Sequence, residues 1–159
     1  MLQAVAASAK ASDIRVTLAG VDATPEMLDV ASARIGSSAE LKHAPAESLP
    51  FEDGAFDTVV TTNALHFFRR SGNALGEMWR VMKPGGRIVV TDCCGDFLAC
   101  RICDHALRVF SPAHHRMYGT RGCRELLQDA GFQSIDIERY KITWFWGLMT
   151  ATASKPKSG

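Results

Sequence analysis

The amino-acid sequence predicts an α/β fold: a doubly wound, mostly parallel sheet with a C-terminal antiparallel hairpin. Strand-length apolar segments alternate with segments of helix length over most of the chain. Such alternation implies parallel strands joined by crossover helices. Residues 87–91 are almost wholly apolar in their interior, as expected of a strand that is buried on both faces.

Length and composition limit the kinds of protein that this chain can be. The chain has 159 residues, 47% of them hydrophobic, which fits one globular domain over residues 1–154 and a solvated tail at 155–159. This composition argues against a disordered or fibrous protein. The net charge of +1 gives no electrostatic basis for binding nucleic acid or an anionic membrane. No apolar run approaches 18 residues, so the sequence predicts no membrane-spanning segment.

Cysteine usage indicates the compartment. Five cysteines are too few for a disulfide scaffold, and their odd number fits a reducing compartment. Since the N-terminus lacks a secretory signal, we expect a cytoplasmic protein. Cys93, Cys94, Cys100 and Cys103 lie near His105, and Cys-x-x-Cys is a zinc-ligand spacing. No second pair accompanies it, and cysteine is also a small core residue, so we predict no metal.

The N-terminal part contains a strand and a helix. Residues 14–21 form the expected strand, which Asp22 closes. Thr24 follows as an N-cap before Pro25 at the first helical position. The helix carries apolar residues on one side, namely Met27, Leu28, Ala31 and Ile35.

A strand–helix–strand unit follows. The Asp53-Gly54 turn leads into a strand at residues 56–62. An amphipathic helix comes next, with apolar residues at i, i+3, i+4 and i+7, namely Leu75, Met78, Trp79 and Met82. Residues 83–86, Lys-Pro-Gly-Gly, stop this helix before the strand at 87–91.

Two helices and two strands complete the chain. The helices are expected at residues 97–110 and 121–130, and Gly131 ends the second. The segments 133–142 and 143–153 follow each other directly, so we expect them to form the antiparallel hairpin.

Ligands bind at the carboxyl ends of the strands in such sheets. This rule selects Asp22 with Ala23, Thr62 with Asn63, and Asp92. A carboxylate just past a buried strand suits a bidentate contact with ribose hydroxyls. Asp22 equally suits a simpler role, in which it helps to cap the following helix, and the residues alone leave both roles open.

Four motifs occur in order: VDATPEML at 21–28, AESLPFEDGAFDTVV at 46–60, MKPGGRIVV at 82–90 and RELLQDAGF at 124–132. Each is weak alone, but in this order and spacing they resemble the class I S-adenosylmethionine-dependent methyltransferases. The resemblance is strongest to the ubiquinone/menaquinone-biosynthesis type and covers about residues 14–154. It implies a Rossmann-like sheet, S-adenosyl-L-methionine as cofactor and a small-molecule acceptor.

The resemblance also implies roles for individual residues. It assigns seven to the cofactor: Asp22, Ala23, Met27, Ala46, Glu47, Asn63 and Leu65. The first would hold the ribose, the next two would line the adenosine, and Ala46 and Glu47 would lie by the adenine. The last two would border the methionine part and the transferred methyl. Pro45 stands where the family usually has an acidic residue to accept from the adenine amino group.

The larger departure from the family pattern is N-terminal. The chain contains no Gly-x-Gly, and counting back about 20 residues from Asp22 puts the glycine loop at or before residue 2. We therefore expect an N-terminally truncated fold, with Leu2–Lys10 as the remainder of the first helix. The missing first strand is central in this topology, so its loss would separate strand 14–21 from strand 56–62 and expose two edges.

Three outcomes follow from the missing strand. The chain is a fragment, or a second copy pairs with the open edges in a homodimer, or the two flanking strands pair directly. The sequence leaves all three open.

Methyl transfer requires alignment and a dry site, and it requires a general base where the acceptor must lose a proton. His66 follows a strand end, while His114, His115 and Tyr118 lie where the family builds its substrate lid. We take His66, His115 and Tyr118 as the candidate catalytic bases.

Three functions remain to be weighed. The first is S-adenosylmethionine-dependent methyl transfer to a small molecule. The second is a catalytically silent methyltransferase-like domain that acts through association or dimerisation, which the open edges favour. A nicotinamide-dependent dehydrogenase would use Asp22 equally well, but the chain lacks the G-x-G-x-x-G fingerprint.

Overall fold

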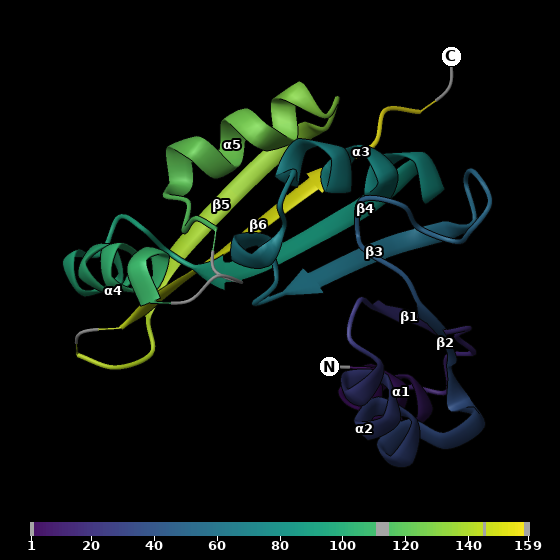
Figure 1. Ribbon diagram of the computed structural model, residues 1–159. Helices are drawn as coiled ribbons and strands as arrows, with labels where there is room; N and C mark the ends of the chain where they lie inside the picture. The colour runs from purple at the N-terminus through teal and green to yellow at the C-terminus, as the bar shows by residue number, and fades with distance from the viewer. Residues whose placement is uncertain (1, 111–114, 145, 158–159) are drawn as a thin grey trace. The chain divides into compact units, whose positions relative to one another are not determined.

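The computed structural model describes residues 2–110, 115–144 and 146–157 (Figure 1). The chain forms two compact units, residues 1–50 and residues 51–159. Each unit has its own sheet, with two strands in the first and four in the second. The α/β class is confirmed, since helices and strands alternate along the chain.

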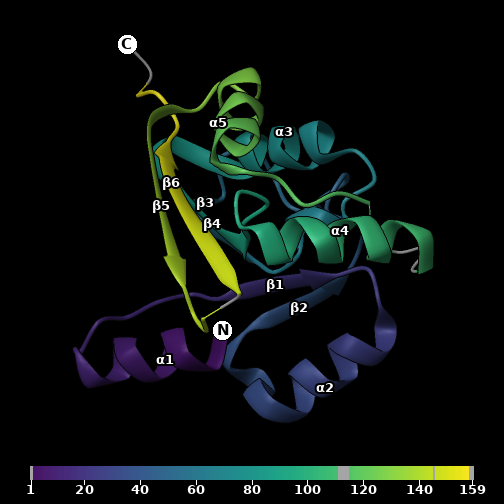
Figure 2. The same cartoon turned by 90° about the vertical axis from the view of Figure 1, so that its left-hand side faces the viewer.

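The first unit is a small parallel α/β unit. It contains α1 (Leu2–Ala11), β1 (Ala19–Asp22), α2 (Pro25–Ile35), a 3-10 turn (Gly36–Ser38) and β2 (Glu40–His43). The strands pair in parallel, with Ala19 opposite Glu40 and Asp22 opposite His43. Both α-helices lie on the same face of this sheet (Figure 2).

Both strands of this unit differ from the sequence prediction. The strand expected at 14–21 begins only at Ala19, because its partner β2 supplies just four residues of ladder hydrogen bonds. The sequence analysis missed β2, since Leu41 is the single apolar residue in Glu40–His43 and gives no alternating pattern. Helices α1 and α2 lie where the sequence predicts them.

The second unit contains the larger sheet, in the order β3-β4-β6-β5. Its strands are β3 (Phe56–Thr62), β4 (Met82–Cys93), β5 (Gln133–Lys141) and β6 (Gly147–Ser154). β3 and β4 are parallel, whereas β6 is antiparallel to both β4 and β5. The predicted C-terminal hairpin is therefore confirmed, and its second strand is the one that joins the parallel part.

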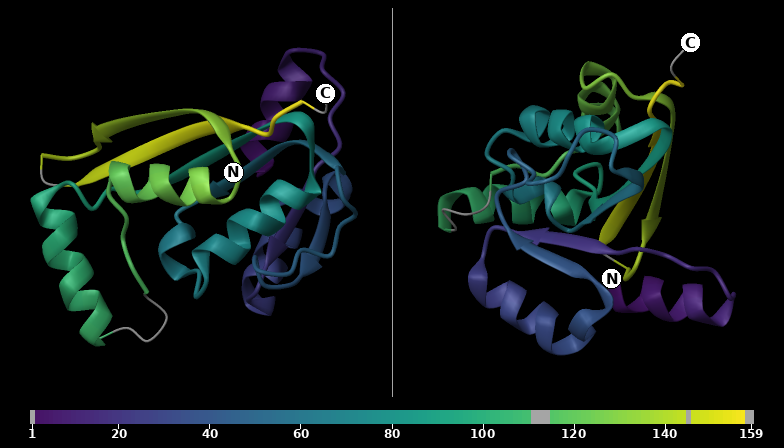
Figure 3. Two further views of the ribbon diagram at one scale, coloured as in Figure 1. Left: turned by 90° about the horizontal axis from the view of Figure 1, so that it is seen from above. Right: turned by 90° about the vertical axis from the view of Figure 1, so that its right-hand side faces the viewer.

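Helices cover one face of this sheet. The unit contains a 3-10 turn η2 (Leu65–Phe67) and the helices α3 (Ser71–Val81), α4 (Leu98–Phe110) and α5 (Thr120–Asp129). α3 and α5 lie side by side over the sheet (Figure 3). Beneath them, helices and strands contribute fully buried side chains: Leu75, Ile88, Leu127 and Met149. None of the helices described is both long and apolar enough to cross a membrane.

Helix α3 ends at Val81, just before the Lys-Pro-Gly-Gly segment that is predicted to stop it, but β4 begins already at Met82, so this segment lies within the strand and not ahead of a strand at 87–91. Gly85 has φ +79°, a conformation that L side chains rarely adopt. A Cβ atom on Gly86 would lie 2.8 Å from the Lys83 carbonyl oxygen and 3.0 Å from that of Asp57. The turn therefore needs glycine at both positions, for two different reasons.

No strand pairing joins the two sheets within the described residues, so β1 and β3 each have one edge without a partner strand. The three outcomes that the sequence leaves open for these two strands stay predictions.

The two units differ in their cores. Most of the buried apolar side chains belong to the second unit. Among the described residues of the first unit, Ala9 is the only hydrophobic residue that is buried, and Ile14 is 60% exposed. Since hydrophobic stabilisation scales with the apolar area removed from water, the first unit contributes little of it.

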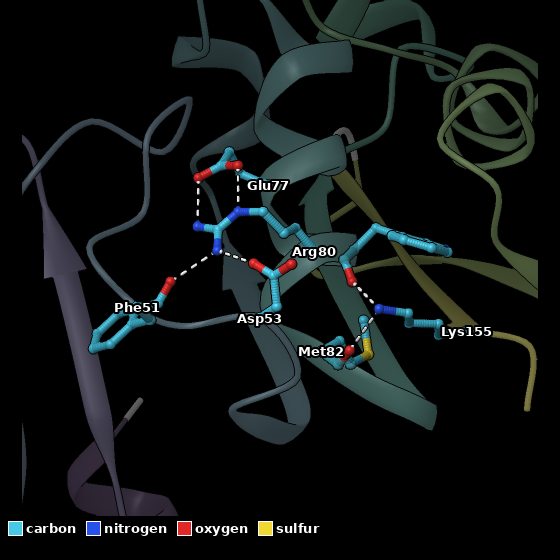
Figure 4. A network of polar contacts seen from close by, with 7 residues as sticks. Phe51, Asp53, Glu77, Arg80, Met82 and Lys155 are labelled. Carbon is cyan, nitrogen blue, oxygen red and sulfur yellow. Dashed lines mark hydrogen bonds and ion pairs between the residues drawn. The ribbon is translucent and has the colours of Figure 1, made fainter. Parts of the chain in front are cut away.

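Arg80 on α3 holds the turn that precedes β3 (Figure 4). Its guanidinium makes a bidentate contact with Glu77, at 2.7 and 2.9 Å. It also donates to the Asp53 carboxylate (2.7 Å) and to the Phe51 carbonyl (2.9 Å). Glu77, and then Asp53, raise the pKa of Arg80 through these bonds. The network thus fixes the predicted Asp53-Gly54 turn against the helix.

Lys155 closes the C-terminal end of α3 (Figure 4). Its Nζ donates to the carbonyl groups of Trp79 (2.9 Å) and Met82 (2.8 Å), and it lies 3.8 Å from the centroid of the Trp79 ring. Its backbone N–H also donates to the Gly86 carbonyl (2.9 Å). The sequence assigned Lys155 to a solvated tail, and this is corrected: the side chain caps a helix far from it in sequence.

Replacing Lys155 with alanine should lower the free energy of unfolding by about 1–2 kcal/mol, because it removes a charge-assisted helix cap and a cation–π contact. Urea denaturation followed by tryptophan fluorescence measures this loss. Lys157→Ala, at an exposed position two residues on, should leave the midpoint nearly unchanged. Equal effects of the two substitutions would contradict the capping role.

Candidate active site

The carboxyl ends of β3 and β4 are neighbours, because the strands are parallel and Thr62 pairs with Thr91. The chain leaves β3 through Asn63, whose backbone N–H donates to the Thr91 carbonyl (2.8 Å). Asn63 has φ +51°, a left-handed conformation that asparagine tolerates better than most residues. This turn leads directly into η2, beside the end of β4.

Asp92, near the end of β4, is bonded to His66 in η2. The residue is 2% exposed. Its Oδ1 accepts from Nδ1 of His66 (2.5 Å) and from the Cys93 backbone N–H (2.6 Å). Its Oδ2 accepts from the His66 backbone N–H (3.2 Å). Three donors therefore compensate a carboxylate that would be costly to bury alone.

The pair also determines which ring nitrogen of a neutral His66 carries the proton. A carboxylate only accepts hydrogen bonds, so Nδ1 must be the protonated nitrogen and Nε2 bears the lone pair. The arrangement is chemically that of an oriented proton acceptor.

The segment after the undescribed residues 111–114 lies against η2. The His115 backbone N–H donates to the His66 carbonyl (2.9 Å). The Tyr118 hydroxyl is 3.2 Å from Ser71 Oγ on α3. The structure therefore places all three candidate bases in the second unit and joins two of them through the backbone. His114 lies outside the described residues.

Five expected cofactor residues belong to the first unit: Asp22, Ala23, Met27, Ala46 and Glu47. Oδ1 of Asp22, at the end of β1, accepts from the Thr24 backbone N–H (2.8 Å). Asp22 thus has the helix-capping role that the sequence left open, while the Thr24 side chain makes no capping bond. The Ala23 carbonyl is 3.0 Å from His43 Nε2. Met27 is 54% exposed, and Ala46 and Glu47 are half-buried in the loop after β2.

The other two expected cofactor residues belong to the second unit. Asn63 is exposed at the end of β3. Leu65 is 2% exposed, so little of this residue is accessible to a ligand.

The sequence analysis missed the contact between Asp92 and His66. The strand-end rule selected Asp92, and the search for a base selected His66. Their positions are 26 residues apart, and no local pattern signals that their side chains meet. The signal becomes visible only when the carboxyl ends of two adjacent parallel strands are considered together.

The five cysteines are all free thiols. Burial raises the pKa of Cys93 to about 11 and that of Cys123 to about 12, in each case with a smaller contribution from Asp92. Within the described residues, no group of three or more histidine, cysteine or acidic side chains is arranged to hold a metal ion.

The Cys123 thiol should alkylate slowly in the folded protein. Only the thiolate reacts, so iodoacetamide at pH 8 should modify Cys123 on the order of a hundredfold more slowly than in the urea-unfolded chain. Because folding favours the protonated thiol, the corresponding stability is present below about pH 9 and is lost as the pH rises toward 12. Peptide mass spectrometry measures the rate, and similar rates in the two states would contradict burial of this thiol.

These features define a class of protein. It is a Rossmann-like α/β domain with polar residues at the carboxyl ends of its strands. The protein-family model described as "Methyltransferase domain" matches residues 3–90, which is more than half of the chain. The chain belongs to this family.

Several curated bacterial proteins are similar to the chain. The Escherichia coli K12 protein YafE, described as uncharacterized, is 43% identical over 75 residues, covering 45% of this chain and 36% of YafE. A demethylmenaquinone methyltransferase of Deinococcus radiodurans is 36% identical over 81 residues, covering 49% and 34%. The uncharacterized methyltransferase YcgJ of Bacillus subtilis is 35% identical over 103 residues, covering 61% and 41%. The matched segments span only about a third to two fifths of these relatives.

Solved structures share the fold at low sequence identity. A putative methyltransferase from Bacillus halodurans has a TM-score of 0.77 at 20% identity and covers 98% of this chain and 89% of its own. A putative methyltransferase, solved in complex with the Haloferax volcanii Trm112 methyltransferase activator, has a TM-score of 0.80 at 18% identity, covering 99% of this chain and 79% of its own. These structures confirm the Rossmann-like architecture.

Proposed function

We propose that this chain is an S-adenosylmethionine-dependent methyltransferase domain that acts on a small-molecule acceptor. The observation that carries the proposal is the family match over residues 3–90. The printed names of two Haemonchus contortus structural neighbours support the cofactor, since those proteins were solved with S-adenosyl-L-methionine or S-adenosylhomocysteine. Relatives named demethylmenaquinone methyltransferases support a small-molecule acceptor.

The residues of the first unit fit the nucleoside end of this cofactor. Asp22 ends a strand. Of its two carboxylate oxygens, only Oδ1 accepts a hydrogen bond from the described residues. Its carboxylate can therefore keep the helix cap and still accept from a ribose hydroxyl. Ala23 and Met27 would line the adenosine, and Ala46 and Glu47 would lie by the adenine. In the second unit, Asn63 and Leu65 would border the methionine part.

When bound, S-adenosylmethionine supplies an activated methyl group, so the protein's own contribution is alignment, exclusion of water and proton removal. Three residues are the candidates for proton removal, namely His66, His115 and Tyr118. His66 is the strongest of them because it contacts a carboxylate, whereas His115 is exposed and the Tyr118 hydroxyl contacts another hydroxyl.

Calorimetric titration with S-adenosylmethionine tests whether the chain binds this cofactor. The wild-type chain should bind it, and Asp22→Asn should weaken binding about tenfold or more, because the amide keeps an acceptor for Thr24 but loses the charge. Asp29→Asn, at an exposed position on α2, is the matched control and should bind normally. Absence of binding heat and of a thermal shift at millimolar cofactor would contradict the proposal.

Methyl transfer itself is tested with labelled S-adenosylmethionine and demethylmenaquinone, the acceptor named by the relatives, kept reduced to its quinol by dithionite so that the ring carbon is electron-rich. Label should appear in the quinone product. Cofactor binding without transfer to this acceptor would contradict the proposed acceptor class but not the cofactor.

A second candidate function, a catalytically silent domain that acts by association, is favoured by the unpaired edges of β1 and β3 and by the thin core of the first unit. Unpaired strand edges are templates for pairing with another chain. A homodimer formed through these edges would sediment at twice the monomer mass of 17.3 kDa. The cytoplasmic location, and the absence of nucleic-acid and membrane partners, stay predictions.

A further inference from the structure

We propose that Asp92 is a positioning residue for His66, and that the pair suits this site to acceptors whose reacting atom must lose a proton. The statement about the acceptor rests on the proposed function. The statement about positioning rests on the geometry of the second unit alone.

Asp92 is a charged residue on the buried face of β4. Side chains two apart on a strand share a face, and Ile88, Val90 and Asp92 are all at most 2% exposed. A carboxylate therefore occupies a position that an apolar side chain would fill. Replacing a buried charge with a well-packed apolar group is often neutral or stabilising, so core packing does not explain this aspartate. Its hydrogen bond to Nδ1 of His66 gives it a specific task.

His66 and His43 provide an internal comparison of tautomers. Nδ1 of His66 faces a carboxylate at 2.5 Å, whereas Nε2 of His43 faces the Ala23 carbonyl at 3.0 Å. Both oxygens act as acceptors, so the facing nitrogen must be the protonated one in each case. The neutral imidazoles are thus expected to be opposite tautomers, with the Nε2 lone pair on His66.

In the proposed step, the acceptor gains a methyl group and loses a proton. The electron pair of the acceptor forms the new bond to the methyl carbon, and the pair of the breaking carbon–sulfur bond stays on sulfur. Nε2 of His66 receives the proton that the acceptor releases. Asp92 holds the ring orientation through Nδ1 and offsets the positive charge of the imidazolium.

His66→Asn is the most informative variant. The asparagine side-chain amide lies near the place of Nδ1, so it keeps an N–H for Asp92 but has no counterpart of Nε2. This variant should fold and bind S-adenosylmethionine normally, and methyl transfer to demethylmenaquinone should fall about a hundredfold or more. His105→Asn, the same change at an exposed position on α4, is the control and should stay close to wild type.

Asp92→Asn tests the positioning role. Loss of the charge should lower kcat roughly tenfold or more, with little change in the KM for the acceptor. A purely structural role would instead lower stability and affect kcat and KM together. Nitrogen-15 NMR of the histidine-labelled full chain gives a readout independent of activity: His66 should show a protonated Nδ1, and His43 a protonated Nε2.

The outcomes separate the two proposals. If the wild-type chain binds cofactor and methylates the acceptor but His66→Asn is equally fast, the inference is overturned and the proposed function stands. If the wild-type chain transfers no methyl group, the acceptor half fails with the proposed function, and the NMR measurement still decides the positioning half. A protonated Nε2 on neutral His66 would overturn that half.

Discussion

Replacing Asp92 with alanine is expected to destabilise the second unit by about 3–5 kcal/mol. The substitution leaves the backbone N–H groups of His66 and Cys93 and the Nδ1 group of His66 without their acceptor. Each buried donor left unsatisfied costs about 1–3 kcal/mol. A typical domain has only about 5–15 kcal/mol of net stability, so the loss is a large part of the total.

Urea denaturation followed by tryptophan fluorescence measures this effect, because all three tryptophans lie in residues 51–159. Asp57→Ala is the control, since the Asp57 side chain is 82% exposed and, among the residues that the structure describes, its carboxylate bonds to Lys83 alone. It should leave the urea midpoint close to wild type. An Asp92→Ala variant as stable as the control would show that the three contacts to this carboxylate contribute nothing to folding.

The second large effect is expected at Leu127 on α5. Its side chain is fully buried, so Leu127→Ala removes apolar contacts and leaves a cavity. The free energy of unfolding should fall by about 2–5 kcal/mol, depending on how far the surrounding core collapses.

Leu28→Ala is the matched substitution in the first unit. Leu28 is only half-buried on α2, so this change should cost about 1 kcal/mol or less. Far-UV circular dichroism reports on both units, and tryptophan fluorescence reports on the second. Equal losses for the two leucine substitutions would contradict the uneven distribution of the core between the units.

Local patterns account for much of the secondary structure. The Asp53-Gly54 turn followed by FDTVVTT predicts a strand at residues 56–62, and β3 has these bounds. Pro25 at the first helical position marks the start of α2. These signals succeed because turn chemistry and side-chain periodicity act over a few neighbouring residues.

The prediction fails where a strand depends on its partner. Residues 14–18 look like a strand but are outside β1, and Glu40–His43 does not look like one but forms β2. Ladder hydrogen bonds join segments that are distant in the sequence, so neither boundary can be derived from the segment itself.

The sequence by itself determined the α/β class, the family resemblance, and the candidate residues at the strand ends, because these depend on residue types in a fixed order. The tertiary structure decided which candidates meet. In it, His66 contacts Asp92, 26 residues away in the sequence. Lys155, which the sequence placed in a solvated tail, caps α3. Such contacts depend on the register of β3 against β4 and of β4 against β6, and register is a property of the assembled sheet.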